Sequence, residues 1–481
     1  MHQLEERSSS QSQQSVKIGY IGGGSRGWAH TLINDLLQCD DLVGSVALYD
    51  VDYDAAQQNA ELANGLADRP EATGDWSFEA YRDVDEALDG ADFVICSIQD
   101  PIEETFVHDI DVPKEYGIYQ PVADTVGPGG VVRSMRAVPQ YREIAATVRE
   151  QCPDAWVINY TNPMTVCTRA LYEEYPDINA IGLCHEVFAI QRLLADIAER
   201  YVDEADDVTG DEIGVNVKGV NHFTWIDEAH WNGHDIFQYL ERELEARKPI
   251  PSFEPGDLED ESYWTNHHEV AFDLYDRFGV LGAAGDRHLA EFVPWYLDID
   301  DPKEIQRWGF RLTPSSARTA DSEGPAKMER YLSGDEAFEF TDSGEEVVEI
   351  MRALVGLEPI KTHVNYPNRG QTPDLPTGAV VETNAMITGG GVAPITAGEL
   401  PREVRSMVQR AIHNQETLIE AGFAGDLDLA FQAFLNDALV TIDRQEARDL
   451  FVELVALERE YLQAYDLADA DVLSDTDVLE R

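Results

Sequence analysis

The chain has 481 residues, and its 92 Asp and Glu outnumber its 35 Lys and Arg, which gives a formal net charge of −57. This balance excludes the basic surface that binding to nucleic acid or docking on an anionic membrane requires. No apolar run approaches the roughly 20 residues that span a bilayer. The five cysteines are scattered without a CxxC pair, so we expect a cytoplasmic protein with reduced thiols.

The acidic excess is one of sign, because charged residues make up only 26% of the chain and hydrophobic residues make up 43%. Only seven of the 35 basic residues are lysine. An acidic, lysine-poor surface over an ordinary core is typical of proteins from salt-loving organisms, where high ionic strength screens self-repulsion. We therefore expect a halophilic protein, and a mesophilic protein that is merely acidic is the alternative.

The first half of the chain alternates strand and helix patterns after a Ser/Gln-rich stretch, residues 1–15, that predicts a disordered tail. Strands are expected at 16–21, 45–49, 91–98 and 155–159, and helices at 28–37 and 54–68. Strands that alternate with helices predict a parallel, doubly wound sheet.

The second half has a more mixed pattern. A short strand is expected at 212–217, a surface loop at 249–261, helices at 343–354 and 401–421, and a segment with strand character at 362–395. The last fifteen residues are acidic, and we expect them to fray.

A glycine-rich turn joins the first strand to the first helix. Gly22, Gly24 and Gly27 satisfy the spacing G-x-G-x-x-G. Such glycines let the backbone approach the pyrophosphate of a dinucleotide at the N-terminus of the helix, and Ser25 lies in the same predicted cofactor-binding loop. Asp50 ends the second strand and would accept hydrogen bonds from the adenosine ribose, which favours NAD over NADP. The alternative is a glycine-rich turn without a cofactor.

Five short segments with reactive side chains are expected at the C-terminal edge of this sheet, where doubly wound folds bind ligands. They begin at Asp124, Thr161, Cys184, Gly219 and Gly285. Cys184 and His222 offer a thiolate and an imidazole, a pair suited to a divalent transition metal with open positions for substrate hydroxyls. A buried structural cysteine and a structural histidine are the alternatives.

Taken together, these motifs make the chain resemble glycoside hydrolase family 4, the glycosidases that depend on NAD and a divalent metal. The resemblance covers nearly the whole ordered chain. Its motifs are Gly22-Gly23-Gly24-Ser25, Thr125-x-Gly-Pro-Gly-Gly, Thr161-Asn162-Pro163, Cys184-His185, Asn221-His222-Phe223, residues 364–371 and residues 375–382.

The resemblance implies an α/β fold of the lactate/malate dehydrogenase-like superfamily. Its parts would be an N-terminal NAD-binding Rossmann domain over 16–205 and a C-terminal α+β domain for substrate binding and oligomerisation over 206–481. A homo-oligomer, either dimer or tetramer, is also implied.

The resemblance further implies an unusual hydrolysis. NAD would oxidise the sugar at carbon 3, a base would remove the acidified proton on carbon 2, and the leaving group would depart before water adds and the ketone is reduced again. The metal, usually Mn²⁺, would polarise the carbon-3 oxygen. The cofactor would therefore be catalytic without net turnover.

Residue roles follow from the same resemblance. Cys184 and His222 match the metal ligands, and Asn162 matches a substrate contact beside the metal. His185 follows the metal cysteine and would protonate the leaving group. Asp124 matches an acidic residue that raises the basicity of the base.

The base is a tyrosine in the family members that act on phosphorylated sugars. Here the corresponding region reads Gly285-Asp286-Arg287-His288, with His288 at the apparent match. Asp286 and His288 are therefore the candidate bases, and a helix N-cap and a satisfied polar side chain are their structural alternatives.

The sugar is suggested by Cys184-His185-Glu186-Val187, which resembles the motif of α-galacturonidases that release galacturonic acid from pectin-derived oligosaccharides. A uronate needs a cation, and Arg287 or Arg369 would form a bidentate clamp. Within the family, α-glucosidase, α-galactosidase and α-glucuronidase are alternatives. An NAD-dependent 2-hydroxy-acid dehydrogenase and a non-enzymatic dinucleotide sensor are alternatives from other classes.

Overall fold

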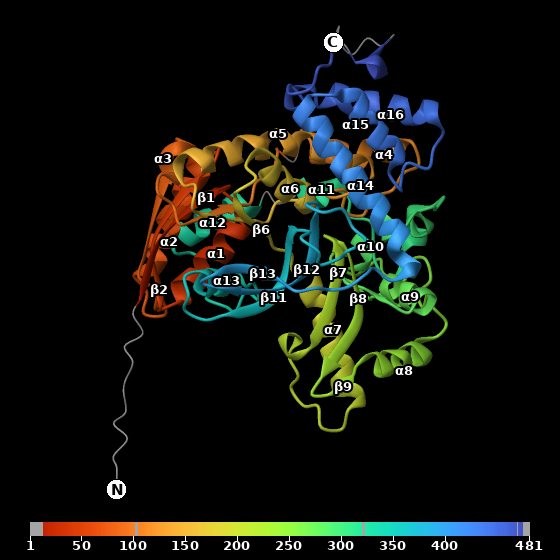
Figure 1. Cartoon of the computed structure of the whole chain (residues 1–481), viewed down its shortest axis with the longest axis horizontal. Coiled ribbons are helices and arrows are strands. Elements are labelled where there is room, and N and C mark those ends of the chain that lie inside the picture. The colour runs from red at the N-terminus through yellow and green to blue at the C-terminus, as the bar shows by residue number, and fades with distance from the viewer. Residues whose placement is uncertain (1–12, 102–103, 320–322, 469, 475–481) are drawn as a thin grey trace.

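The computed structural model describes residues 13–101, 104–319, 323–468 and 470–474. Most of the tail predicted over residues 1–15 lies outside these ranges, and the first strand begins at Gln14, two residues before its predicted start. Within the described part, a mixed sheet of 13 strands forms the centre of the molecule, and helices cover it (Figure 1).

The first half of the sheet is parallel, in the strand order β3-β2-β1-β4-β5-β6. Its strands are β1 (Gln14–Ile21), β2 (Leu42–Tyr49), β3 (Trp76–Tyr81), β4 (Phe93–Cys96), β5 (Trp156–Asn159) and β6 (Asn179–Gly182). Its helices are α1 (Trp28–Gln38), α2 (Tyr53–Ala67), α3 (Val84–Leu88), α4 (Phe106–Glu115), α5 (Gly127–Gln151) and α6 (Met164–Glu174). This strand order is that of a Rossmann fold, so the predicted doubly wound sheet is confirmed.

Hydrophobic spacing explains these elements. Strand β1 buries Ile18 and Tyr20 between its neighbours, as expected for a strand that is covered on both faces. Helix α1 buries Leu32 and Leu36, four residues apart, on the side that packs against the core.

The second half of the sheet is antiparallel and continues from β6 in the order β11-β12-β7-β8-β10. Its strands are β7 (Gly214–Val220), β8 (Phe223–Trp231), β9 (His234–Asp235), β10 (Leu281–Gly282), β11 (Ile360–Pro367), β12 (Val380–Thr388) and β13 (Gly391–Pro394). The seam between the halves pairs Asn365 of β11 with Gly182 of β6. Because β11 of the second half pairs with β6 of the first half, the two halves share one continuous sheet.

Most helices of the second half lie around the antiparallel strands and above them, whereas those over 323–333 and 347–354 lie beside α1 and α2 of the parallel half (Figure 1). They are α7 (Glu186–Tyr201), α8 (Phe237–Arg247), α9 (Glu269–Phe278), α10 (Asp286–Phe292), α11 (Ser315–Thr319), α12 (Glu323–Ser333), α13 (Val347–Leu354), α14 (Arg402–Ala424), α15 (Leu427–Asn436) and α16 (Arg444–Leu457). Among the described helices, none has both the length and the apolar composition needed to cross a membrane.

Most predicted elements of this half are found. The loop over 249–261 carries no helix or strand, and α14 matches the helix predicted at 401–421. Helix α13 begins at Val347, four residues later than predicted. The reason is local, because Gly344 adopts a φ of +70° and Ser343 donates its hydroxyl to Asp35 instead of entering the helix.

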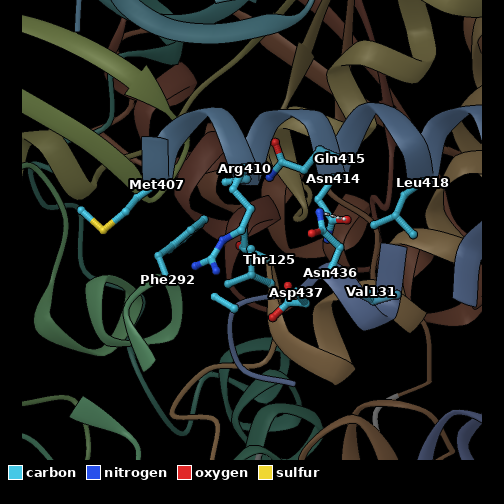
Figure 2. A pocket seen from close by; sticks show the side chains of 13 residues that line it. Thr125, Val131, Phe292, Met407, Arg410, Asn414, Gln415, Leu418, Asn436 and Asp437 are labelled. Atoms are coloured by element: carbon cyan, nitrogen blue, oxygen red, sulfur yellow. Dashed lines mark hydrogen bonds between the residues drawn. The ribbon is translucent and has the colours of Figure 1, made fainter. Parts of the chain in front are cut away.

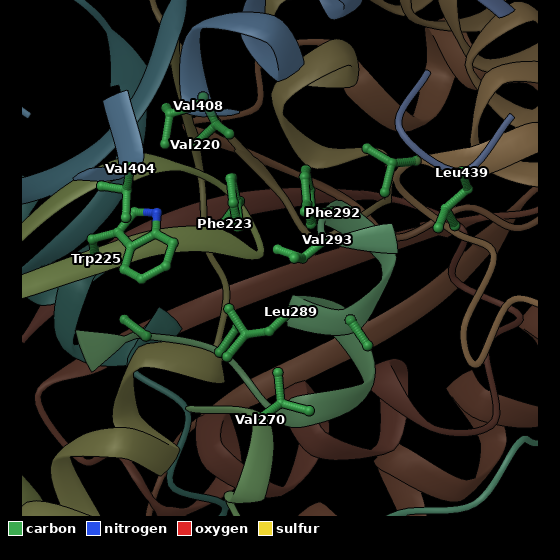
Figure 3. Packing of buried hydrophobic residues seen from close by; sticks show 14 of the residues in the cluster. Val220, Phe223, Trp225, Val270, Leu289, Phe292, Val293, Val404, Val408 and Leu439 are labelled. Atoms are coloured by element: carbon green, nitrogen blue, oxygen red, sulfur yellow. The ribbon is translucent and has the colours of Figure 1, made fainter. Parts of the chain in front are cut away.

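Helix α10 is anchored in the larger hydrophobic core, between the β7–β8 hairpin and α14 (Figure 3). Phe292 stacks on Phe223 with ring centroids 4.6 Å apart and an interplanar angle of 2°. Leu289 and Val293 are fully buried in the same cluster. This packing fixes the position of α10, whose polar residues matter for the site below.

A buried ionic network joins the end of β4 to the last helices. The guanidinium of Arg136 on α5 is paired with Asp100 at 2.9 Å, with Asp109 at 2.7 Å and with Glu458, which follows α16. Arg136 is 1% exposed, so three carboxylates compensate a charge that is out of contact with water.

Candidate functional site

The turn between β1 and α1 has the shape that a dinucleotide needs. Gly22 has a φ of +94°, and a Cβ atom on it would lie 2.0 Å from the carbonyl oxygen of Ser97, so only glycine fits there. A Cβ atom on Gly27 would meet nothing within 4 Å. In the first turn of α1, the N–H of Trp28 donates to Ser25 Oγ at 3.2 Å, and neither the N-cap side chain nor an acidic residue competes for the amides that follow, which suits a phosphate. The residues therefore fit a bound dinucleotide.

Side chains from the second strand and helix hold this turn in place. Asp50 accepts the N–H of Gly24 at 2.9 Å. Asn59 of α2 donates to the carbonyl oxygens of Gly23 and Ser25 at 2.8 and 2.9 Å. Sequence reasoning missed Asn59, and the available signal was an asparagine on the otherwise apolar buried face of α2.

Four of the predicted site residues meet at the C-terminal edge of the sheet. Asp124 precedes α5, Asn162 follows β5, His222 lies in the turn between β7 and β8, and His288 lies on α10. The Asn162 amide donates to Asp124 Oδ2 at 3.0 Å, and the rings of His222 and His288 stack with centroids 3.7 Å apart. One ligand atom from each of Asp124, His222 and His288 lies within 4.8 Å of the others.

His222 is held in one tautomer by its neighbours. It occupies the two-residue turn of the hairpin with a φ of +64°, and Thr125 Oγ1 lies 2.8 Å from its Nδ1. The same hydroxyl lies 2.7 Å from a carboxylate oxygen of Asp124, which only accepts. The Thr125 proton therefore goes to Asp124, and the Thr125 oxygen accepts the Nδ1–H of His222. This leaves the lone pair of Nε2 for a metal.

The charges of the group agree with this arrangement. Burial, followed by the neighbouring His288, lowers the pKa of His222 to about 3, so the imidazole is neutral at pH 7. Burial alone would raise the pKa of Asp124, but the neighbouring His288, His222 and Arg133 outweigh burial and hold the pKa of this carboxyl well below its usual value. Asn162 Oδ1 is buried and has no hydrogen-bond partner in the described structure. Imidazole, carboxylate and amide oxygen together fit an ion such as Mn²⁺.

Cys184 lies beside this group and is not one of the three residues whose ligand atoms are within 4.8 Å of each other. It follows β6, and its neighbours include Asn221, Glu186 and Glu382. Burial, together with these two carboxylates, raises the pKa of the Cys184 thiol well above its ordinary value. The thiol is therefore protonated in the absence of a metal, and a metal would have to displace the proton.

His185 is the N-cap residue of α7 and is half exposed. Its ring nitrogens lie 3.6 Å from Glu186 and 3.7 Å from Glu345. Glu186 also lies 3.9 Å from His288 Nε2 and accepts the N–H of Gly285 at 2.5 Å. Glu186 thus connects the predicted acid to the predicted base, a role that the sequence motif alone did not reveal.

Asp286 does not join the group. Its carboxyl is fully buried beneath the first turn of α9, and Oδ1 accepts the N–H of Ala271 at 3.0 Å. Burial raises the pKa of Asp286 to about 7. These contacts favour the capping alternative for Asp286, with α9 as the capped helix, and leave His288 as the candidate base.

The two arginines expected to bind a sugar carboxylate have different positions. Arg287 on α10 donates to the carbonyl oxygen of Pro121 at 2.7 Å and to Thr313, and it stacks on Trp264. Arg369 follows β11, which runs antiparallel to β6, so it lies toward the N-terminal end of β6 and away from Cys184. We therefore withdraw Arg369 as a substrate contact. Sequence order could not reveal this, because the register of β11 is set by tertiary pairing.

Glu291 is a further residue that sequence reasoning missed. It lies on α10 three residues after His288, is fully buried, and its Oε1 accepts the N–H groups of Val122 and Ala123 at 2.7 and 2.8 Å. Ala123 has a φ of +59°, a conformation that costs free energy in a residue with a side chain. Glu291 thus holds the strained turn that presents Asp124 to His222.

A pocket behind Thr125 separates the group from α14 (Figure 2). Arg410, Gln415 and Leu418 of α14 line one side of it, and Phe292 and Thr125 line the other. Both amide atoms of Gln415 are buried and without a hydrogen-bond partner in the described structure. Helix α14 therefore lines the back of the site with both apolar and polar side chains.

Comparison with known proteins assigns both halves of the chain to the same family. The model for family 4 glycosyl hydrolases matches residues 17–200, and that for the family's C-terminal domain matches residues 217–440. An α-galacturonidase from Thermoanaerobacterium saccharolyticum is 45% identical over 457 residues, which cover 94% of this chain and 97% of that protein.

Solved structures agree with this assignment. A Bacillus subtilis protein described as a glucosidase superposes with a TM-score of 0.84 at 44% identity, covering 92% of this chain and 100% of that chain. A 6-phospho-α-glucosidase from gut microorganisms, solved with NAD and Mn²⁺, has a TM-score of 0.76 at 19% identity, covering 93% of this chain and 99% of that chain. The latter likeness is one of fold.

Proposed function

The chain belongs to glycoside hydrolase family 4, and on that premise we propose that it hydrolyses α-linked galacturonides with NAD and a divalent metal bound. The observation that carries the proposal is the neutral His222, fixed by Thr125 with Nε2 available, beside Asp124 and His288. A simple 2-hydroxy-acid dehydrogenase has no need of such a metal-binding group next to its cofactor turn.

Bound NAD supplies a hydride acceptor, and a bound metal ion such as Mn²⁺ supplies Lewis-acid polarisation of a sugar oxygen. We assign the metal to His222 and Cys184, because the Cys184 thiol contacts Asn221, the residue that precedes His222. Asp124 and Asn162 lie where they can contact the metal or the sugar hydroxyls that it binds. Gly22, Gly24, Ser25, Gly27 and Asp50 form the proposed cofactor turn.

The remaining roles are proton transfers. We assign His288 as the base that accepts the proton on carbon 2, since it lies against His222 and Glu186 is near enough to stabilise its protonated form. We assign His185 as the acid that donates a proton to the leaving-group oxygen, because it is half exposed at the edge of the group between two carboxylates. Glu186 then faces both histidines and couples their charges.

The choice of galacturonide is supported by the relative from Thermoanaerobacterium saccharolyticum, which is named an α-galacturonidase. The test uses reduced protein with NAD and Mn²⁺ on digalacturonate and on a nitrophenyl α-glucoside. We expect release of galacturonate without a net change in NADH absorbance, and loss of that release when a chelator removes the metal.

Two results would contradict the proposal. Hydrolysis of the glucoside alone would refute the uronate assignment. Net NADH formation from a 2-hydroxy acid, without cleavage of any glycoside, would refute a glycosidase and support a dehydrogenase.

We also propose a cytoplasmic homo-oligomer. The five cysteines are all free thiols, which supports a reducing compartment. The oligomer rests on the family resemblance, and light scattering coupled to size-exclusion chromatography distinguishes monomer, dimer and tetramer.

A further inference from the structure

Three lysine or arginine side chains are buried in the described part of the chain, and two of them are paired with carboxylates. Lys218, 3% exposed, contacts Asp227 at 2.6 Å. Arg136, 1% exposed, has the three carboxylate partners described above. Arg133 is 8% exposed and has no carboxylate within 4.0 Å among the described residues.

The partners of Arg133 are neutral. Its Nε donates to the carbonyl oxygen of Asn162 at 2.9 Å, and an Nη donates to the side chain of Gln99 at 3.0 Å. Its guanidinium also lies 5.7 Å from the ring centroid of Phe106. A buried cation without a direct ion pair is costly, and in a chain of net charge −57 acidic partners are abundant. The structure therefore keeps a desolvated positive charge available for an anion that is not part of the chain.

The position of Arg133 indicates which anion this is. Gln99 follows β4 and Asn162 follows β5, and the Asn162 side chain is bonded to Asp124. Arg133 is therefore one side chain away from the reactive group. The cofactor phosphates have their own donors at the N-terminus of α1, on the turn after β1. Asp124 interacts with the guanidinium only at longer range, beyond the 4.0 Å of an ion pair, and its oxygens accept from Thr125 and Asn162.

We propose that Arg133 binds the carboxylate of the galacturonate unit and so determines the preference for a uronide over a neutral sugar. The inference rests on the proposed function, because it names the group by which that substrate is recognised. Arginine suits the task, since its fork offers parallel N–H donors to both oxygens of a carboxylate.

The test compares two sugars that differ in this carboxylate. Galacturonate and galactose are titrated by calorimetry into the protein loaded with NAD and Mn²⁺, for the wild type, Arg133→Gln and Arg133→Lys. We expect Arg133→Gln to weaken galacturonate binding about 10- to 100-fold, as for a lost charge-assisted hydrogen-bond pair, and to change galactose binding less than about 3-fold. Arg133→Lys keeps the positive charge but loses the planar fork of the guanidinium. Its affinity for galacturonate should therefore lie between those of the wild type and Arg133→Gln.

Arg149→Gln is the matched control, because Arg149 is on the same helix, is 43% exposed and pairs with Glu174. It removes the same charge from the chain and should leave both affinities unchanged. Thermal unfolding of each variant is measured alongside, and Arg133→Lys keeps the test available if Arg133→Gln does not fold.

Three outcomes decide the matter. Equal weakening of both sugars by the Arg133 variants would overturn the inference and leave a positioning role for Arg133. Weaker NAD binding with unchanged galacturonate binding would overturn it in favour of a cofactor phosphate. If wild-type protein binds galactose but no galacturonate, the proposed function fails, and this result is distinct from a failure of Arg133 alone.

Discussion

The parallel and antiparallel halves of the sheet contribute to the site in different ways. The parallel half provides shape through its backbone: Gly22 brings the cofactor turn against Ser97, and the first helix leaves its N-terminus open. The antiparallel half provides the two stacked imidazoles His222 and His288, on a strained hairpin turn and a short helix, and Asp124 and Asn162 reach them from loops of the parallel half. Positions that depend on backbone shape tolerate only particular residue types, whereas the reactive positions depend on contacts between distant segments.

Replacement of His222 tests the antiparallel half most directly. Asparagine tolerates the left-handed backbone of this turn, so His222→Asn removes the imidazole with little strain. We expect activity to fall roughly a thousandfold or more, since several kcal/mol of stabilisation by the metal would be lost. Metal binding measured by electron paramagnetic resonance of Mn²⁺ should weaken in parallel. The control is His230→Asn on the exposed side of β8, and unchanged Mn²⁺ binding in His222→Asn would contradict the site.

Gly22→Ala tests the parallel half. The added Cβ atom would lie 2.0 Å from the Ser97 carbonyl oxygen, at a φ of +94°. We expect a loss of about 3 kcal/mol in the free energy of unfolding and a marked loss of NAD affinity, measured by urea denaturation and by fluorescence titration. Gly65→Ala in α2, where a Cβ atom meets nothing within 4 Å, should be as stable as the wild type or more stable. Equal free energies of unfolding and equal NAD affinities for Gly22→Ala and Gly65→Ala would contradict the steric explanation for Gly22.

Glu291 tests whether the two halves are coupled through α10. Glu291→Leu leaves the buried N–H groups of Val122 and Ala123 without an acceptor, so we expect about 2 kcal/mol less stability and a 10- to 100-fold weaker Mn²⁺ affinity. Glu291→Gln keeps the accepting oxygen and should restore most of the affinity. Burial, the largest cause, raises the pKa of Glu291 to about 8, so the neutral amide also matches its charge at pH 7. If Glu291→Gln bound Mn²⁺ as weakly as Glu291→Leu does, Glu291 would not hold the turn before Asp124 by accepting its N–H groups.

The smallest expected effect concerns Asp35 on α1, away from the cofactor turn. Burial first, and then Glu349 and Asp342, raise the pKa of Asp35 to about 6. The folded protein therefore holds this proton more tightly than the unfolded chain, whose aspartate pKa is about 3.9, and stability is lost as the pH rises from about 4 to about 6. The Asp35→Asn variant has no such proton to lose. Above pH 6 its free energy of unfolding should therefore exceed that of the wild type by on the order of 1 kcal/mol, a value reduced for the screening of Asp35 by solvent. Urea unfolding at pH 5 and pH 8 measures it, and a gain independent of pH would contradict the explanation.

Sequence reasoning succeeded where local spacing carries the information. The strand, glycine turn and helix over residues 14–38 lie together because their sequence is contiguous, and Asp50 ends the next parallel strand. The convergence expected for Asn162, Cys184 and His222 rests on the shared carboxyl edge of parallel strands, which holds for Asn162 after β5 and Cys184 after β6, whereas His222 reaches the group from the antiparallel β7–β8 hairpin.

Sequence reasoning failed where distant pairing decides position. Arg369 had suitable chemistry, but the antiparallel register of β11 carries it to the other end of β6. Asp286 and His288 are two residues apart on α10, yet one is buried under α9 and the other stacks on His222. Arg133 was overlooked because nothing in its local sequence distinguishes it from Arg136, one turn away on α5. Only the absence of a nearby carboxylate in the described structure separates them.

The network around Arg136 also has a consequence for the order in which the protein is made. Arg136 and Asp109 are synthesised early, whereas Glu458 is 322 residues further along the chain than Arg136. At translation rates of about 5–20 residues per second, this carboxylate leaves the ribosome roughly 15–60 s after the arginine. The parallel half therefore pairs this cation with Asp100 and Asp109 first, and Glu458 joins the network only at the end of synthesis. Premature termination before residue 458 would leave the cation paired with two carboxylates but would remove the contact that ties α5 to the segment after α16.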